Sequence, residues 1–141
     1  MKRPPSTEPL KNPSTTTISC CCQGTSSVSR FMTTAVRGRL PESSMRRGTS
    51  SPLTAFVGFP REKVTWAGAP PLTYQHSEKA DRLFCGKCGS QLAYLSRTRT
   101  DRIDLYTASL EAPEMFPPTK VAFGGEALSF TGHIHELPDW S

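Results

Sequence analysis

The chain has 141 residues, a formal net charge of +5 at pH 7, 13 prolines and an apolar share of 35 %. This length allows one domain with a modest core, and the low apolar share indicates that part of the chain stays outside it. No apolar run approaches the roughly 18 residues of a membrane span, and the polar start is unlike a signal peptide. We therefore expect an intracellular protein, cytoplasmic or nuclear, with no membrane partner and with reduced cysteines.

Positive charge is concentrated in the first 50 residues, which hold eight Lys or Arg against two Glu. The rest of the chain is nearly neutral, with nine basic against ten acidic residues. The basic third predicts a solvated surface, with nucleic acid or chromatin as an alternative partner. No aromatic residue is interleaved among its clustered arginines, so no base-stacking platform is evident. These arginines are Arg37, Arg39, Arg46 and Arg47.

The first part of the chain has weak structural signals. Residues 1–15 are rich in Pro, Ser, Thr and Lys, which predicts a disordered tail before a single domain over 16–141. The β-branched run that starts at Thr15 predicts a first strand, and residues 28–32 continue it or pair with it. Residues 33–51 show no periodicity, so we expect a mobile loop there.

From residue 52 onward, short apolar runs alternate with turn residues. Strands are predicted over 53–57, 64–66, 72–74, 82–84, 91–95 and 103–108, with the first of these stopped by Gly58-Phe59-Pro60. A single helical turn is possible over 111–116, and two short apolar runs follow at 121–123 and 128–130. The sequence therefore predicts an all-β or mostly β single domain.

One pair of cysteines has the spacing of a metal-binding turn. Cys85 and Cys88 are each followed by glycine, which permits the positive φ that converging sulfurs tend to need. A second pair must come from the adjacent cysteines at positions 20, 21 and 22. This pattern favours zinc, while a thioredoxin-like redox pair and a pair without any ligand are the alternatives.

The order and spacing of several motifs, from about residue 46 to the end, resemble the family of glutathione-dependent formaldehyde-activating enzymes and centromere protein V. The resemblance implies a zinc-binding β fold of the Mss4-like class and a carbon–sulfur lyase that acts on a glutathione–aldehyde adduct. It also implies two zinc ions in an active member, one structural and one catalytic. The motifs are Phe59-Pro60, Trp66 with Gly68, Tyr74 with Ser77, Phe84 to Leu92, Ala108 to Pro113, and Leu137-Pro138.

The structural zinc site of this family joins an early C-x-C to the later C-x-x-C. Carried over to this chain, its ligands are Cys20, Cys22, Cys85 and Cys88. Cys21 is an alternative early ligand, but alternate residues on a strand project to one face, which favours positions 20 and 22. Four thiolates form a closed site that stabilises the fold.

At the catalytic zinc site this chain departs from the family pattern. The run Arg46 to Pro52 matches the segment that follows the catalytic C-x-C-x-x-C, which sets Leu40 to Met45 opposite the three cysteines. None of these residues is cysteine; we expect Glu42 to be solvated and Met45 to pack. A catalytically silent zinc module that binds a protein or chromatin partner is therefore the alternative function. His133 and His135 could provide two ligands of a further metal site if they share one side of a strand. We expect instead that both histidines are exposed on a strand without a metal.

Overall fold

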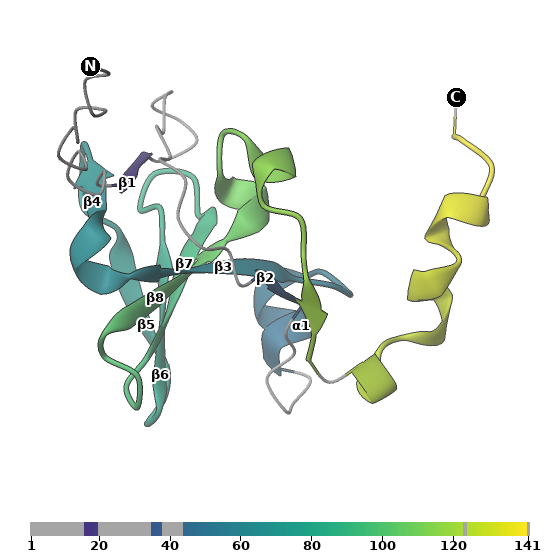
Figure 1. Cartoon of the computed structure of the whole chain (residues 1–141), viewed down its shortest axis with the longest axis horizontal. Helices are drawn as coiled ribbons and strands as arrows, with labels where there is room; N and C mark the ends of the chain where they lie inside the picture. Colours follow the sequence, from purple (N-terminus) through teal and green to yellow (C-terminus); the bar gives the residue numbers. More distant parts are fainter. Residues whose placement is uncertain (1–15, 20–34, 38–43, 123, 141) are drawn as a thin grey trace, which may run out of the picture.

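The computed structural model describes residues 16–19, 35–37, 44–122 and 124–140, and its centre is a twisted sheet (Figure 1). The strands are β1 (Thr16–Ser19), β2 (Ala35–Arg37), β3 (Ala55–Pro60), β4 (Val64–Ala67), β5 (Leu72–Ser77), β6 (Ala80–Phe84), β7 (Gln91–Ser96), β8 (Arg102–Tyr106) and β9 (Lys120–Val121). The helix α1 (Ser44–Thr49) precedes β3. The 3-10 helices are η1 (Arg61–Lys63), η2 (Thr107–Ser109), η3 (Pro113–Met115), η4 (Gly124–Glu126), η5 (Ser129–Gly132) and η6 (Ile134–Glu136).

The main sheet has the strand order β5-β6-β7-β8-β3-β2-β9. Strands β5 to β8 form an antiparallel meander, because each is joined to the next by a short turn. β3 and β2 extend it in antiparallel pairing, and β9 adds to β2 in parallel. β1 and β4 form a separate parallel pair. The fold is therefore mostly β, as the sequence predicts.

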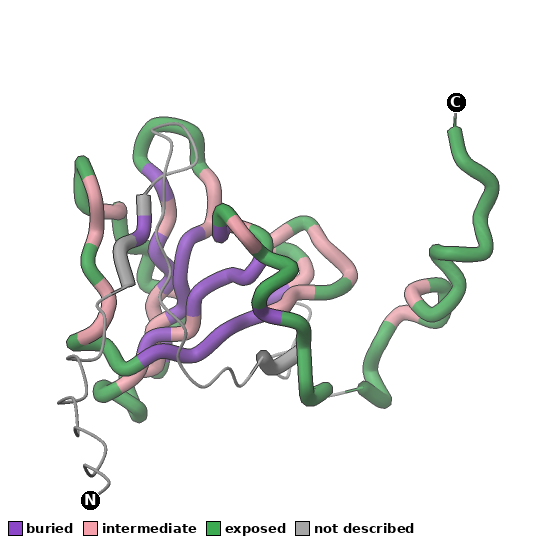
Figure 2. Tube along the Cα trace, turned by 45° about the horizontal axis from the view of Figure 1, so that its top comes forward, coloured by how far each residue is buried: buried purple, intermediate pink, exposed green. Residues whose placement is uncertain are grey.

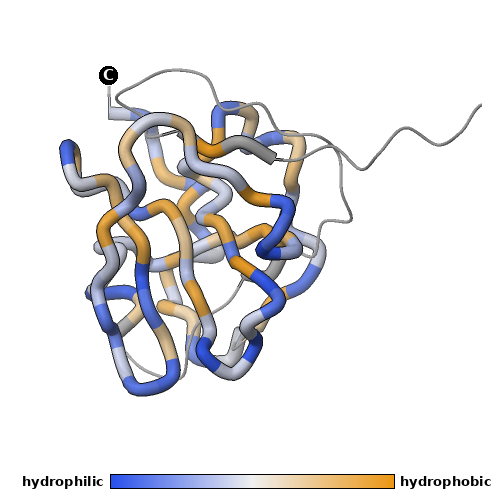
Figure 3. The backbone as a smooth tube through the Cα atoms, turned by 90° about the vertical axis from the view of Figure 1, so that its left-hand side faces the viewer, coloured by the Kyte–Doolittle hydropathy of each residue, from blue (hydrophilic) through white to orange (hydrophobic). Residues whose placement is uncertain are grey.

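Alternation along the strands gives the sheet two buried faces. On one face Val57 is paired with Leu105, and both side chains are fully buried. Phe59 lies edge-on to Phe116, with ring centroids 6.1 Å apart. Burying each such side chain contributes about 1.5–3 kcal/mol. Figure 2 shows this buried layer in purple, and Figure 3 shows apolar positions along the strands with hydrophilic residues at the turns.

The helix α1 covers part of the opposite face. Met45 is 3 % exposed and belongs to a cluster with Phe56 and Tyr106, whose ring centroids are 4.6 Å apart. The hydroxyl of Thr49 donates a hydrogen bond to the Met45 carbonyl at 2.8 Å, near the end of the helix. Packing rather than helix propensity stabilises α1, since six residues with an internal glycine form no stable helix alone.

The structure confirms most of the predicted strands and corrects three expectations. A strand is present at 16–19 and in each range predicted between 53 and 108. However, β3 continues through Gly58 to Pro60, and β8 ends at Tyr106, so residues 107 and 108 belong to η2 and not to a strand. The loop prediction for 33–51 is wrong at β2 and α1. The short apolar run at 128–130 forms no strand in the structure, and η5 begins within it. The prediction for residues 28–32 and the predicted tail over 1–15 lie outside the described residues.

Within the described ranges, no helix is long and apolar enough to cross a membrane. The C-terminal segment from η4 to Trp140 extends away from the sheet (Figure 1). It forms one wall of a cavity beside α1, which is described below.

Candidate metal centre and ligand cavity

The turn between β6 and β7 presents two cysteines on a hydrogen-bonded backbone. The Cys85 N–H donates to the Ser90 carbonyl at 2.9 Å, and the Gly89 N–H donates to the Cys85 carbonyl at 2.8 Å. Gly89 has a φ of +75°, which a residue with a Cβ rarely adopts. This turn therefore needs glycine at position 89, as the sequence pattern indicates.

The same turn directs polar hydrogens at the Cys85 sulfur. Cys85 is 5 % exposed, and its Sγ accepts a hydrogen bond from the Lys87 backbone N–H at 3.4 Å. In the reduced chain the same N–H would donate to a zinc-bound sulfur. The Cys88 thiol is exposed and lies 3.2 Å from the Ser90 hydroxyl. These two residues fit the chemistry of half a four-thiolate site.

The oxidation state of Cys85 determines whether it can bind a metal. Its sulfur takes part in a disulfide in this structure. A disulfide and a zinc thiolate are alternative states of one sulfur, so zinc binding requires the reduced form. Measurements of zinc binding therefore need a reductant.

The other two predicted ligands, Cys20 and Cys22, lie outside the described residues. The strand that leads to them ends at Ser19, and its Ile18 is 2 % exposed. Ile18 and Cys85 line one apolar cavity of about 270 Å³. The described end of β1 thus lies beside the β6–β7 turn. The four-cysteine set stays a prediction, and the part of the chain that the structure describes contains no group of three or more Cys, His, Asp or Glu placed for a metal.

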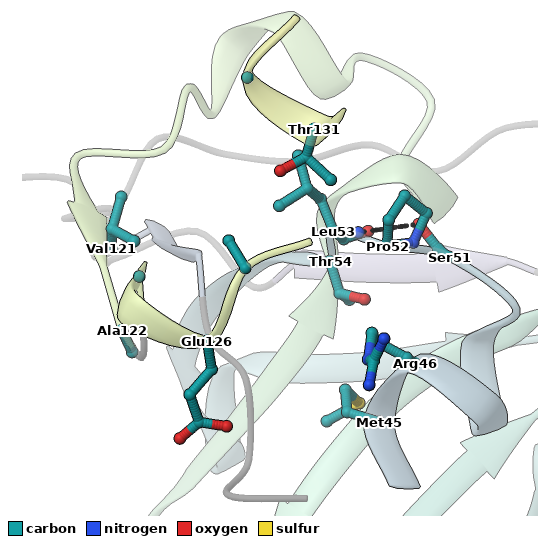
Figure 4. A pocket seen from close by; sticks show the side chains of 13 residues that line it. Met45, Arg46, Ser51, Pro52, Leu53, Thr54, Val121, Ala122, Glu126 and Thr131 are labelled. Carbon is teal, nitrogen blue, oxygen red and sulfur yellow. Dashed lines mark hydrogen bonds between the residues drawn. The ribbon is translucent and has the colours of Figure 1, made fainter. Parts of the chain in front are cut away.

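A second cavity lies between α1, the segment before β3 and the C-terminal segment (Figure 4). Its volume is about 210 Å³, and we call it the α1 cavity. Segments far apart in sequence form it, and Figure 4 shows their side chains around the opening. It is lined by Met45, Arg46, Ser51, Pro52, Leu53, Thr54, Val121, Ala122, Gly124, Glu126, Ala127, Thr131 and Gly132.

Behind this cavity, two donors converge on the sulfur of Met45. The Arg82 Nη2 lies 3.9 Å from Met45 Sδ, and the Tyr106 hydroxyl lies 3.8 Å from it. Arg82 is 5 % exposed, which is rare for an arginine. Its guanidinium fits beneath α1 because Gly48 has no side chain: a Cβ there would be 1.4 Å from Arg82 Nη1.

A model of the glutathione-dependent formaldehyde-activating enzyme family matches residues 15–126 of the chain. The chain belongs to this family. The family fold is Mss4-like, in agreement with the antiparallel sheet and the cysteine turn. No curated protein matches the chain.

The resemblance to this family sets Leu40, Glu42 and Met45 opposite the catalytic cysteines, and this correspondence stays a prediction. Of these three residues, Leu40 and Glu42 lie outside the described residues, and Met45 is described. Met45 packs, as expected. Its thioether is neutral and contacts a guanidinium, whose positive charge would repel a metal ion. This position therefore does not fit the family's catalytic zinc.

The histidine pair does not form the half-site that a strand would give. His135 lies in η6 rather than in a strand, and His133 lies immediately before this helix. Both are exposed, and His133 Nδ1 is 3.0 Å from a Glu136 carboxylate oxygen. Their expected exposure is confirmed, whereas the strand geometry is wrong because no strand of the described ranges pairs with this segment.

Burial also shifts the titration of two tyrosines under α1. Desolvation raises the pKa of Tyr106 and of Tyr94 above the ordinary value of 10.0, and the charge of Arg82 partly opposes both shifts. The fold therefore favours the neutral phenols. Their contribution to stability is present below pH 10 and is lost as the pH rises through the folded pKa.

We therefore expect the free energy of unfolding to fall as the pH rises above 10, with a shallower slope for Tyr106→Phe. Each tyrosine contributes at most one proton, or about 1.4 kcal/mol per pH unit. Urea unfolding of both proteins between pH 9 and about pH 11 measures the slope. Equal slopes for the variant and the unchanged chain would contradict a buried phenol at position 106.

Proposed function

We propose that this chain is a zinc-stabilised protein of the carbon–sulfur lyase class that binds a glutathione–aldehyde adduct in the α1 cavity. The family match supports the reaction class. The position of the cavity carries the proposal, because its lining includes Met45, which the sequence resemblance sets opposite the third catalytic cysteine. A substrate bound there would contact the part of the fold where the family performs its chemistry.

The proposed zinc ligands are Cys20, Cys22, Cys85 and Cys88. The sulfur-directed N–H of Lys87 and the closeness of Ile18 to Cys85 support this set. A closed four-thiolate site stabilises the fold, and it leaves no open position for substrate. We therefore expect about one structural zinc ion per chain.

The described residues contribute binding and orientation to the proposed reaction. In the synthetic direction the glutathione sulfur bonds to the aldehyde carbon, and the thiol proton ends on the aldehyde oxygen. Holding the two reactants together lowers the entropic part of the barrier. Because Met45 does not fit a catalytic metal, we derive no step through such an ion.

The test combines turnover with metal counting. Exchange NMR of glutathione and formaldehyde, with the zinc-loaded protein in reductant, measures adduct formation and breakdown. We expect exchange faster than without protein, and about one zinc per chain by elemental analysis. Exchange at the uncatalysed rate would overturn the lyase function and leave the silent module.

The alternative function is a catalytically silent zinc module that binds a protein or chromatin partner. The guanidinium of Arg82 against Met45 Sδ favours it, because a cation contacts the residue that the resemblance sets opposite a catalytic cysteine. If chromatin is the partner, the full chain should bind DNA with a strong salt dependence. Replacing Lys2, Arg3, Lys11 and Arg30 by glutamine should then reduce the salt dependence of DNA binding. An unchanged salt dependence would contradict the chromatin partner.

A further inference from the structure

One wall of the α1 cavity holds the half-buried cationic side chain of Arg46. Arg46 extends from α1 into the cavity wall, and its Nε is buried without a hydrogen-bond partner in the described part of the chain (Figure 4). A buried guanidinium N–H without an acceptor costs free energy, and an acceptor supplied by a ligand would recover it. An acceptor on a ligand in the cavity would therefore satisfy this atom.

The hydroxyl groups of the cavity are already used as donors. The Thr131 hydroxyl donates to the Leu128 carbonyl at 2.7 Å, and the Ser51 hydroxyl donates to the Leu53 carbonyl. The hydroxyls of Thr54 and Thr49 are hydrogen-bonded to each other, with 3.4 Å between the oxygens. Arg46 is thus the side chain best placed to donate to a ligand, and a guanidinium prefers a planar oxyanion.

The rest of the lining indicates what kind of anion fits. Glu126 lies on the opposite wall, so repulsion grows with the negative charge of the ligand and a monoanion fits better than a dianion such as phosphate (Figure 4). Most of the remaining walls are apolar, which suits a hydrocarbon stem. The apolar lining consists of Met45, Pro52, Leu53, Val121, Ala122 and Ala127.

We propose that the α1 cavity binds the carboxylate of a small acid with an apolar stem, and that Arg46 is the residue that anchors it. The carboxylate site and the proposed glutathione–aldehyde site share the α1 cavity. The inference rests on the proposed function only for the identity of the ligand beyond its carboxylate. Carboxylate binding needs neither glutathione nor turnover, so the two proposals can fail separately.

The probe is butyrate, with its neutral amide butyramide and inorganic phosphate as comparisons. NMR titration of the ¹⁵N-labelled zinc-loaded chain follows the Arg46 Nε–Hε signal and gives a dissociation constant. We expect saturable binding of butyrate that shifts this signal, and weaker binding of both comparisons. Butyramide or phosphate binding as tightly as butyrate would overturn the proposal, as would no saturable binding of butyrate.

Three variants locate the site. Arg46→Gln should weaken butyrate binding at least about tenfold, because it removes a charged hydrogen bond. Arg47→Gln is the matched control: Arg47 is the next residue, is exposed and does not line the α1 cavity, so binding should change less than about twofold. Equal losses of butyrate affinity in Arg46→Gln and Arg47→Gln would show a general attraction of the anion to positive charge and would overturn the site.

The third variant blocks the cavity without changing Arg46. Gly132 lines the cavity, and a Cβ there meets no atom within 4 Å, so Gly132→Leu has room to enter the ligand volume. We expect it to abolish butyrate binding while the melting temperature stays near that of the unchanged chain. Unchanged binding in Gly132→Leu would overturn the location, even if Arg46→Gln fails to fold.

Discussion

Replacing Cys85 by serine is expected to abolish zinc binding and to unfold the domain. Cys85 is buried at the end of β6, where the Lys87 N–H donates to its sulfur. Structural zinc in small peptides contributes about 10–16 kcal/mol, which exceeds the net stability of most domains of this size. Circular dichroism and elemental analysis of the purified protein in reductant measure both effects.

The neighbouring cysteines provide a matched control for this experiment. Cys20→Ser and Cys22→Ser should behave like Cys85→Ser, whereas Cys21→Ser should keep zinc and a normal melting temperature. Loss of zinc in Cys21→Ser with retention in Cys22→Ser would instead place Cys21 in the ligand set. Folded, zinc-loaded Cys85→Ser protein would contradict the four-cysteine site.

The disulfide at Cys85 is a second source of stability beside zinc. A reductant separates the two contributions, because it removes the disulfide and leaves the zinc site. With the disulfide reduced, a strong zinc chelator should melt the unchanged chain if zinc holds the fold. A chain that stays folded in chelator and reductant would show that the core alone is sufficient.

Features set by local sequence were predictable, whereas those set by tertiary contacts were not. The strands follow apolar alternation, and the β6–β7 turn follows from glycine at 89 beside the cysteines. The helix α1 has no periodic pattern, and it depends on Met45 packing against Phe56 and Tyr106. No local signal showed that β6 would bury Arg82.

The candidate cavity escaped prediction for the same reason. Its walls come from α1, from residues 51–54 and from residues 121–132, which no spacing rule brings together. Arg46 was counted with the basic residues of the first third, and its position in a cavity appears only in the fold. Its place at the start of the run Arg46 to Pro52, which resembles a family motif, is the signal that points to it. Its position in a cavity is not readable from that run.

Adding a side chain at Gly48 is expected to destabilise the domain through Arg82. A Cβ at Gly48 would lie 1.4 Å from Arg82 Nη1 and 2.5 Å from Cζ, so the guanidinium must leave its buried position. Overpacking of this kind costs about 1–3 kcal/mol, which corresponds to a fall in melting temperature of roughly 5–10 °C in a domain of this size. Thermal unfolding of Gly48→Ala measures it.

Gly125→Ala is the control, because a Cβ at position 125 meets no atom within 4 Å, and its effect should stay within about 0.5 kcal/mol. The double variant Gly48→Ala with Arg82→Met tests the cause. If the guanidinium produces the clash, the cost of Gly48→Ala should shrink when Arg82→Met is already present, giving a coupling free energy of about 0.5–3 kcal/mol. Strictly additive effects would contradict the contact.

Since α1 carries both Met45 and Arg46 to the cavity, Gly48→Ala should also weaken butyrate binding, whereas Gly125→Ala should not.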